Sequence, residues 1–299
     1  MAEQRTAEKT ARKPRKIRRK ELVENIRQHK GLFILYTVLR ALVILVLVVQ
    51  LLNRNYENVF LCVLTLILFI LPSAVEIRME IDIPAGMQAI ILLFIFSAEI
   101  LGEINKYYLI FPQWDTMLHT LNGFLAAVIG FALIDLLNRS ERFSFKLSPL
   151  FVVLVAFCFS MTIGVMWEFF EHFMDMGFGL DMQKDTVIHE ISSVMLNPTG
   201  ANRPETIRNI TSTVVNGQEL GLNGYLDIGL IDTMEDLFVN FIGAVSFSVI
   251  GYGYLKYRGR KNRIVKELIP TWKGEEALPM PEEKTQEEEK KYENQQGNL

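Results

Sequence analysis

The stretch LFILYTVLRALVILVLVVQLL, from Leu32 to Leu52, decides the class of this protein. A helix needs about 20 mostly apolar residues to cross the hydrocarbon core of a bilayer, and this stretch meets that length. Its one charged residue is Arg40. A guanidinium at that depth has to reach the interface, face a polar cavity or meet a carboxylate. The stretch therefore predicts a transmembrane helix.

Five further segments are apolar over a comparable length. Half of the 299 residues are hydrophobic and 22% are charged, and the charges concentrate at the two ends of the chain. This distribution excludes a disordered chain, a collagen-like repeat and a small disulfide-bonded scaffold. The predicted fold class is all-α: a polytopic membrane protein with a six-helix transmembrane bundle. The second and third segments match the bilayer least well, so we expect them to be short or distorted. The expected spans are 32–52, 58–75, 86–102, 116–137, 149–170 and 230–255.

Lysine and arginine are distributed unevenly around these spans. They crowd the segment before Gly31, recur in 139–146 and return after the last span from Lys256. With six spans these regions share one side of the membrane, and the positive-inside rule makes that side the cytoplasm. We expect a bacterial cytoplasmic (inner) membrane protein with both termini cytoplasmic, and no cleaved signal peptide.

The same reasoning divides the chain into three parts. Residues 1–31 form a basic cytoplasmic segment, 32–255 the six-span transmembrane domain, and 256–299 a cytoplasmic tail that is basic, then acidic and disordered. Next to a span, the basic segment is better explained by topology and anionic lipid than by nucleic acid. Membrane lipid is therefore the expected partner, without nucleic acid, and the oligomeric state is left open.

Polar residues gather at the predicted outer ends of the later spans. In the fourth span Asp115, His119 and Asn122 lie at i, i+4 and i+7, which places them on one helical face. Gly123 and Gly130 follow, as expected of a helix packed tightly against neighbours. In the third span Glu99 and Glu103 form a further i, i+4 pair, which adds a fourth helix with acids near the outer leaflet.

The fifth and sixth spans repeat this pattern. One face of the fifth carries acids and an imidazole at i, i+3, i+4 and i+7, and one face of the sixth carries polar residues at i, i+4 and i+8. Polar side chains within spans usually face a partner or a cavity. The residues are Glu168, Glu171, His172 and Asp175 in the fifth span, and Asp232, Asp236 and Asn240 in the sixth.

These acids predict a functional polar site at the outer face. Any one of them could instead be solvated or cap a helix, as Asp115 and Asp232 would. Several carboxylates in one site, however, need a proton or a cation between them. Oxygen ligands with an imidazole suit Zn, Mn, Mg or Fe as a divalent ion. The catalytic candidates are Asp115, His119, Glu168, Glu171, Asp232 and Asp236; the metal-ligand candidates are these six with Asp175; Asn122, Asn240 and His172 support them.

Three motifs in order carry a resemblance to a known family. They are WDxxxH at 114–119, WExxExxxD at 167–175 and GLIDTxxDLxxxxxGA at 229–244. On these the stretch from about Arg78 to Tyr254 resembles the YjdF-like family of uncharacterised bacterial inner-membrane proteins. His172 departs from the family, where an aromatic residue is commoner. A more remote likeness reaches the VanZ-like membrane proteins, which are linked with glycopeptide-antibiotic tolerance and so imply a cell-envelope role. Neither family implies a settled reaction.

The outer connection, 176–228, is longer than the resemblance leads us to expect. Its segment 188–196 predicts a short amphipathic helix on the membrane surface, either as a cap over the site or as part of an ordinary surface loop.

Three functions remain open on the sequence. The site could hold a divalent ion and act as a hydrolase or transferase on a lipid-linked envelope precursor or glycan precursor. It could couple cations or protons to transport, although no inverted repeat is evident. It could also belong to a non-catalytic envelope or stress-tolerance component with a structural ion.

Overall fold

The computed structural model describes residues 30–79, 81–111, 113–139, 147–256 and 268–272. Within these ranges six helices are long and apolar enough to cross a membrane, which confirms the predicted all-α, multi-pass class. The basic segment before Lys30 and the tail after Trp272 lie outside the described residues. The spans are Lys30–Leu52, Tyr56–Arg78, Ala85–Ile104, Trp114–Asp135, Pro149–Phe178 and Leu230–Lys256.

The described residues form two compact units, one within 30–111 together with 268–272 and the other within 113–256. The first contains three of the spans and a short antiparallel pair in which Ile81 lies opposite Trp272. Its elements are α3 (Lys30–Leu52), α4 (Tyr56–Leu68), α5 (Leu71–Met79), β1 (Ile81–Asp82), α6 (Ala85–Phe96), the π-helix η1 (Ser97–Ile104), α7 (Tyr107–Ile110) and β8 (Thr271–Trp272).

The second and third spans are distorted, as predicted. The second is broken between α4 and α5, where Pro72 lies in the first turn of α5; proline is tolerated there because that turn has no intrahelical partner for the missing N–H. The third passes from α6 into the π-helix η1, which contains Glu99 and Glu103. The Arg40 guanidinium lies over the Tyr36 ring, 5.2 Å from its centroid. Among the described ion pairs none joins Arg40 to Glu99.

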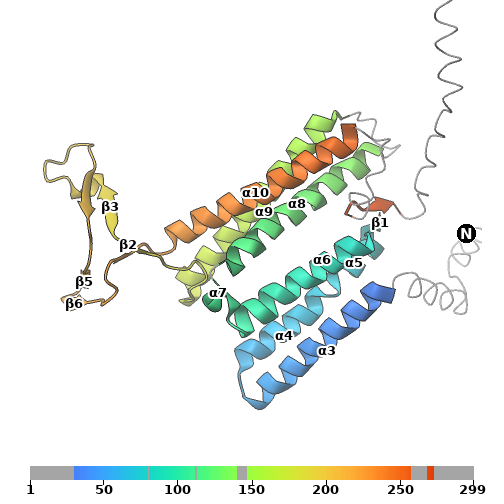
Figure 1. Ribbon diagram of the computed structural model, residues 1–299, viewed down its shortest axis with the longest axis horizontal. Helices are drawn as coiled ribbons and strands as arrows, with labels where there is room; N and C mark the ends of the chain where they lie inside the picture. Colours follow the sequence, from blue (N-terminus) through green and yellow to red (C-terminus); the bar gives the residue numbers. More distant parts are fainter. Residues whose placement is uncertain (1–29, 80, 112, 140–146, 257–267, 273–299) are drawn as a thin grey trace, which may run out of the picture. The chain divides into compact units, whose positions relative to one another are not determined.

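The second unit is a bundle of three helices that run side by side in Figure 1. They are α8 (Trp114–Arg139), α9 (Pro149–Phe178) and α10 (Leu230–Lys256). Local sequence sets both ends of α9. The Ser148 side chain accepts a hydrogen bond from the Phe151 amide, with Pro149 at the first helical position, and Gly179 ends the helix at φ 66°, a left-handed conformation that glycine adopts without strain.

Helices α8 and α10 touch through glycines. A Cβ at Gly123 would collide with the Asn240 backbone carbonyl, and one at Gly243 with that of Thr120. The Ser160 hydroxyl of α9 donates to the Gly123 carbonyl at 2.7 Å. These contacts agree with the close packing predicted from the small residues of the fourth and sixth spans, and they bring the polar faces of the three helices together.

Between α9 and α10 the chain forms an insert of short strands, which extends beyond the ends of these helices in Figure 1. It consists of three antiparallel pairs, so the helix predicted over 188–196 is wrong: that segment is strand, ending in a 3-10 turn at Val194–Leu196. β-branched and serine residues dominate the segment and disfavour helix, and β3 finds a partner in β4. The strands are β2 (Val187–Ile188), β3 (Glu190–Ser193), β4 (Glu205–Arg208), β5 (Val214–Val215), β6 (Gln218–Glu219) and β7 (Tyr225–Leu226).

Candidate metal centre

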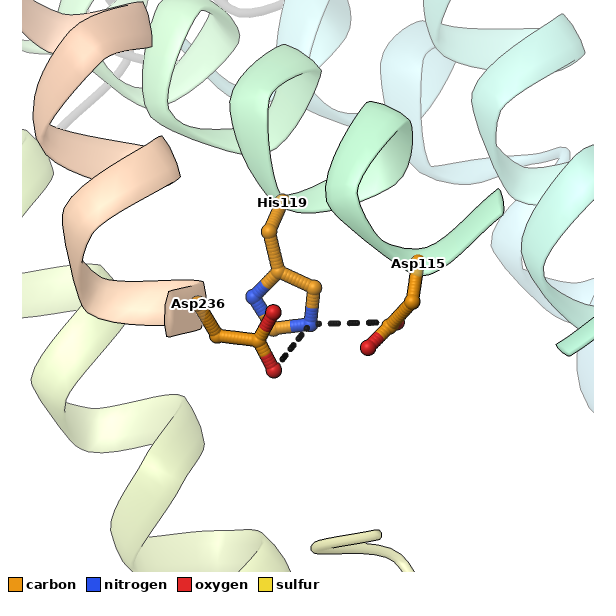
Figure 2. A group of neighbouring side chains, drawn as sticks. All are labelled: Asp115, His119 and Asp236. Atoms are coloured by element: carbon orange, nitrogen blue, oxygen red, sulfur yellow. Dashed lines mark ion pairs between the residues drawn. The ribbon is translucent and has the colours of Figure 1, made fainter. Parts of the chain in front are cut away.

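His119 of α8 lies between two aspartates from different helices, as Figure 2 shows. Its Nε2 atom is 3.5 Å from Asp115 Oδ1, one turn earlier on α8, and 3.5 Å from Asp236 Oδ2 on α10. The side chain of His119 is 11% exposed and that of Asp236 6%, whereas Asp115 is 29% exposed. The group is therefore buried between helices and reaches solvent on the Asp115 side.

Helix α9 adds two buried glutamates. Glu168 and Glu171 lie one turn apart and are 4% and 7% exposed. Glu168 Oε1 is 3.9 Å from the second imidazole nitrogen, Nδ1 of His119. The Trp167 indole donates a 2.8 Å hydrogen bond to Glu171 Oε1, which fixes that carboxylate. The imidazole of His119 thus faces acids of all three helices.

Two groups of side chains have the spacing of metal ligands. One comprises Asp115, His119 and Asp236, the other Glu168, Glu171 and Asp236, and in each group the ligand atoms lie within 4.8 Å of one another. Two bonds of about 2.1 Å join ligand atoms up to about 4.2 Å apart, so small side-chain rotations reach coordination distance. The donors fit a divalent ion that accepts carboxylate oxygen and imidazole nitrogen.

Three carboxylate oxygens of this cluster lack a hydrogen-bond partner although they are buried. They belong to the three most buried acids of the cluster and are Glu168 Oε2, Glu171 Oε2 and Asp236 Oδ2, the last of which lies 3.5 Å from His119 Nε2. Buried polar atoms are normally satisfied, and an unpaired buried carboxylate carries a large desolvation penalty. These oxygens therefore have lone pairs directed into the protein that a bound cation or a proton would satisfy.

A pair of asparagines, Asn122 of α8 and Asn240 of α10, lies one helical turn after His119 and Asp236. Asn240, 1% exposed, accepts a long hydrogen bond of 3.4 Å from the Asn122 side chain. Its amide nitrogen is 3.7 Å from the Met161 sulfur. A Cβ at Gly164 would collide with the Asn240 side chain. Both asparagines thus lie beside the cluster, as the sequence pattern suggested, and pack α8 against α10.

Asp175 and Asp232 have other hydrogen-bond partners. Asp175 accepts from the amides of Met182 and Gln183 at 2.6 and 2.8 Å, and Asp232 from the Lys184 amide at 2.8 Å. Neither aspartate belongs to the two ligand groups. They attach the first residues of the insert to the C-terminal end of α9 and the N-terminal end of α10.

His172 also contacts the first residues of the insert. It is exposed, and its Nδ1 atom lies 3.3 Å from the Gln183 side-chain oxygen. Gln183 in turn donates to the Thr233 hydroxyl at 2.6 Å. His172 therefore lies at the rim of the cluster, outside both ligand groups.

Two residues near the acids were not predicted from the sequence. Trp167 stands four residues before Glu171, a spacing from which its hydrogen bond could have been anticipated. Gln183 bridges α9 and α10 from the insert, a long-range contact without any local signal.

The fold and the site define a six-span membrane protein with a buried carboxylate and imidazole cluster in its last three spans. Residues 35–257 match the family model described as a predicted membrane protein (DUF2238). The chain therefore belongs to this family, which agrees with its resemblance to uncharacterised YjdF-like membrane proteins. The likeness to VanZ-like proteins stays a prediction. Comparison with curated proteins and with solved structures returns no match.

Proposed function

We propose that this protein is a metal-dependent hydrolase or transferase that acts on a phosphate-bearing lipid precursor at the outer face of a bacterial inner membrane. The observation that carries the proposal is the set of buried oxygens without a hydrogen-bond partner on Glu168, Glu171 and Asp236. A cluster built only to join helices would satisfy its own polar atoms, because an unpaired buried carboxylate is destabilising.

The residues divide by exposure into two roles. A divalent ion held here would supply Lewis-acid chemistry to a phosphoryl group and would lower the pKa of an attacking water. The buried acids and His119 would hold the ion, with Trp167 fixing Glu171 through its 2.8 Å hydrogen bond. Asp115 is the most exposed of the clustered acids, so as a ligand it would hold the ion on the side that water and substrate can reach.

The position of the cluster supports a lipid-linked substrate. Its members lie in the first turns of α8 and α10 and in the last three turns of α9, ends that the positive-inside rule puts at the outer face, where they would meet the headgroup of a lipid. Lys184 stands beside them, with its amide bonded to Asp232 and its ammonium donating to the Asp181 carbonyl. An ammonium at this place would attract a phosphate group.

The test is turnover by the full-length protein in nanodiscs. Polyprenyl diphosphate and phosphatidic acid are supplied with Mn²⁺, Mg²⁺ or Zn²⁺, and released phosphate and transfer products are measured. We expect metal-dependent turnover that falls at least about 100-fold in Glu168→Gln. The matched control is Glu235→Gln, an exposed acid of α10 outside both ligand groups, which should retain activity.

Other outcomes discriminate the alternative functions. Metal bound without turnover of any of these lipids would overturn the enzyme proposal in favour of a structural ion in a non-catalytic envelope component. Ion flux into proteoliposomes that is lost in Glu168→Gln would overturn it in favour of transport.

The proposed orientation has its own test. Met195 in the insert is 89% exposed, and Met195→Cys would be introduced after Cys62 and Cys158 are replaced by serine. A membrane-impermeant maleimide should label it in intact cells, because the positive-inside rule puts the insert outside. Labelling only after lysis would show that the insert faces the cytoplasm, so the topology would be the reverse of the proposed one and the site would lie at the cytoplasmic face.

A further inference from the structure

Asp236 belongs to both groups of possible metal ligands, one shared with α8 and the other with α9. We propose that the cluster is a two-ion centre: one ion held by Asp115, His119 and Asp236, the second by Glu168, Glu171 and the same Asp236 as a bridge. The inference rests on the metal site of the proposed function and adds to it a second ion and its ligands.

The charges of the cluster favour two ions. Its four carboxylates carry four negative charges when ionised, and the neutral imidazole of His119 adds none. One divalent ion would leave half of that charge uncompensated in a buried site, where like charges repel strongly. Two divalent ions balance it.

The distribution of donor atoms also favours two ions. The α8 pair and the α9 pair are each separated by about one helical turn, so each pair presents two donors on one face. The two nitrogens of His119 point to different acids, with Nε2 toward Asp115 and Asp236 and Nδ1 toward Glu168. Asp236, on the third helix, is the residue within reach of both pairs, and a carboxylate has an oxygen for each of two ions.

The buried oxygens without a hydrogen-bond partner favour an ion in the α9 group. All three belong to that group, on Glu168, Glu171 and the shared Asp236. A single ion held by the α8 group would leave both glutamate oxygens buried and unpaired. An ion in the all-oxygen α9 group satisfies them, and two-ion sites of this kind hold their metals about 3.5–4 Å apart.

The test uses Mn²⁺, which accepts both oxygen and imidazole ligands and reports on its neighbour by electron paramagnetic resonance. The full-length protein is purified in nanodiscs, loaded with Mn²⁺ and freed of excess ion. Metal per chain is measured by mass spectrometry, and the spectrum is recorded at low temperature. We expect two ions per chain and an exchange-coupled spectrum in place of the signal of isolated Mn²⁺.

Single substitutions should separate the two ions. His119→Ala and Glu171→Gln should each leave one ion per chain with an uncoupled signal, and Asp236→Asn should lose both. Glu235→Gln should keep both, and size-exclusion profiles identify variants that fail to fold. One uncoupled ion in the wild-type protein would overturn the two-ion centre while leaving the proposed metal site standing. No retained ion would overturn both.

Discussion

The two units of this protein each carry acids spaced one turn apart on an apolar helix. Among the described residues, only in the second unit do acids from several helices come together in a cluster. In the first unit Glu99 and Glu103 share the π-helix η1, and Glu103 is exposed. Among the described residues of that unit no further acid, histidine or cysteine comes close enough to complete a ligand group. In the second unit three helices each bring at least one acid to the same place.

This difference shows what spacing along one helix can and cannot do. A face with two acids is compatible with solvation or local hydrogen bonding, whereas convergence of several helices removes water and leaves only other protein groups or a ligand. Among the described spans the fourth, which carries Asp115 and His119, is the most buried: 56% of its most apolar stretch lies inside the structure, against 28% for the third, fifth and sixth spans.

The largest effect should come from exchanging an acid for its amide in each unit. Asp236→Asn removes the carboxylate common to both ligand groups, so retained Mn²⁺ should fall to background. Glu99→Gln makes the same chemical change in the first unit and should leave retained Mn²⁺ at the wild-type value. Equal losses from both variants would break the comparison, because the acids of the first unit would then hold metal as well.

The next largest effect concerns the glycine contact that brings the helices of the second unit together. Gly123→Ala forces a methyl group against the Asn240 backbone carbonyl, and overpacking of this kind destabilises by about 1–3 kcal/mol. Gly253→Ala, on the same bundle with open space at its Cβ position, is the control and should change stability by less than about 1 kcal/mol. Thermal unfolding in detergent measures both, and similar melting temperatures would show that α8 and α10 are not packed this closely.

A smaller change should follow loss of the indole hydrogen bond to Glu171. Trp167→Phe keeps an aromatic ring but removes the donor, and loss of a hydrogen bond to a metal ligand typically weakens metal binding about 10–100-fold. Phe170→Leu removes the ring packed against Trp167, with centroids 5.4 Å apart, and keeps the donor. Mn²⁺ titration should therefore separate the two variants; equal affinities would assign Trp167 a packing role alone.

The smallest effect on metal is expected at Asp175. Asp175→Ala removes the acceptor of the Met182 and Gln183 amides, and loss of such bonds to a charged group is worth about 1.5–3 kcal/mol. Hydrogen exchange at these amides should accelerate at least tenfold while Mn²⁺ retention stays unchanged. A loss of Mn²⁺ would instead make Asp175 a ligand, as its helical spacing with Glu168 and Glu171 suggested.

Much of this arrangement could be predicted because membrane spans and helical faces are local properties. The length of an apolar run can be counted directly in the sequence, so five of the six spans were predicted to within three residues at each end, whereas the fifth was predicted to end at 170 and continues to Phe178. The short strands of 187–226 were not predicted, because a single strand has no hydrogen bonds of its own. Each strand is stabilised by a partner elsewhere in the chain, as where Ile191 lies opposite Ile207.

The candidate site was predicted in part for the same reason. Helical spacing grouped Glu168 with Glu171 and Asp115 with His119. It grouped Asp175 and Asp232 with them equally well, because periodicity along one helix carries no information about a neighbour. Only the approach of the insert distinguishes these aspartates, since the backbone amides of 182–184 satisfy their carboxylates.

The sequence by itself determined the class of the protein, the number of its spans and the helical faces that carry acids, since bilayer thickness and the helical repeat act on neighbouring residues. Tertiary structure alone decided which acids meet. The close approach of α8 and α10 at Gly123 and Gly243 brings His119 and Asp236 together, and α9 adds Glu168 and Glu171. Contacts between helices have no period along the chain, so the cluster exists only once the three helices are packed.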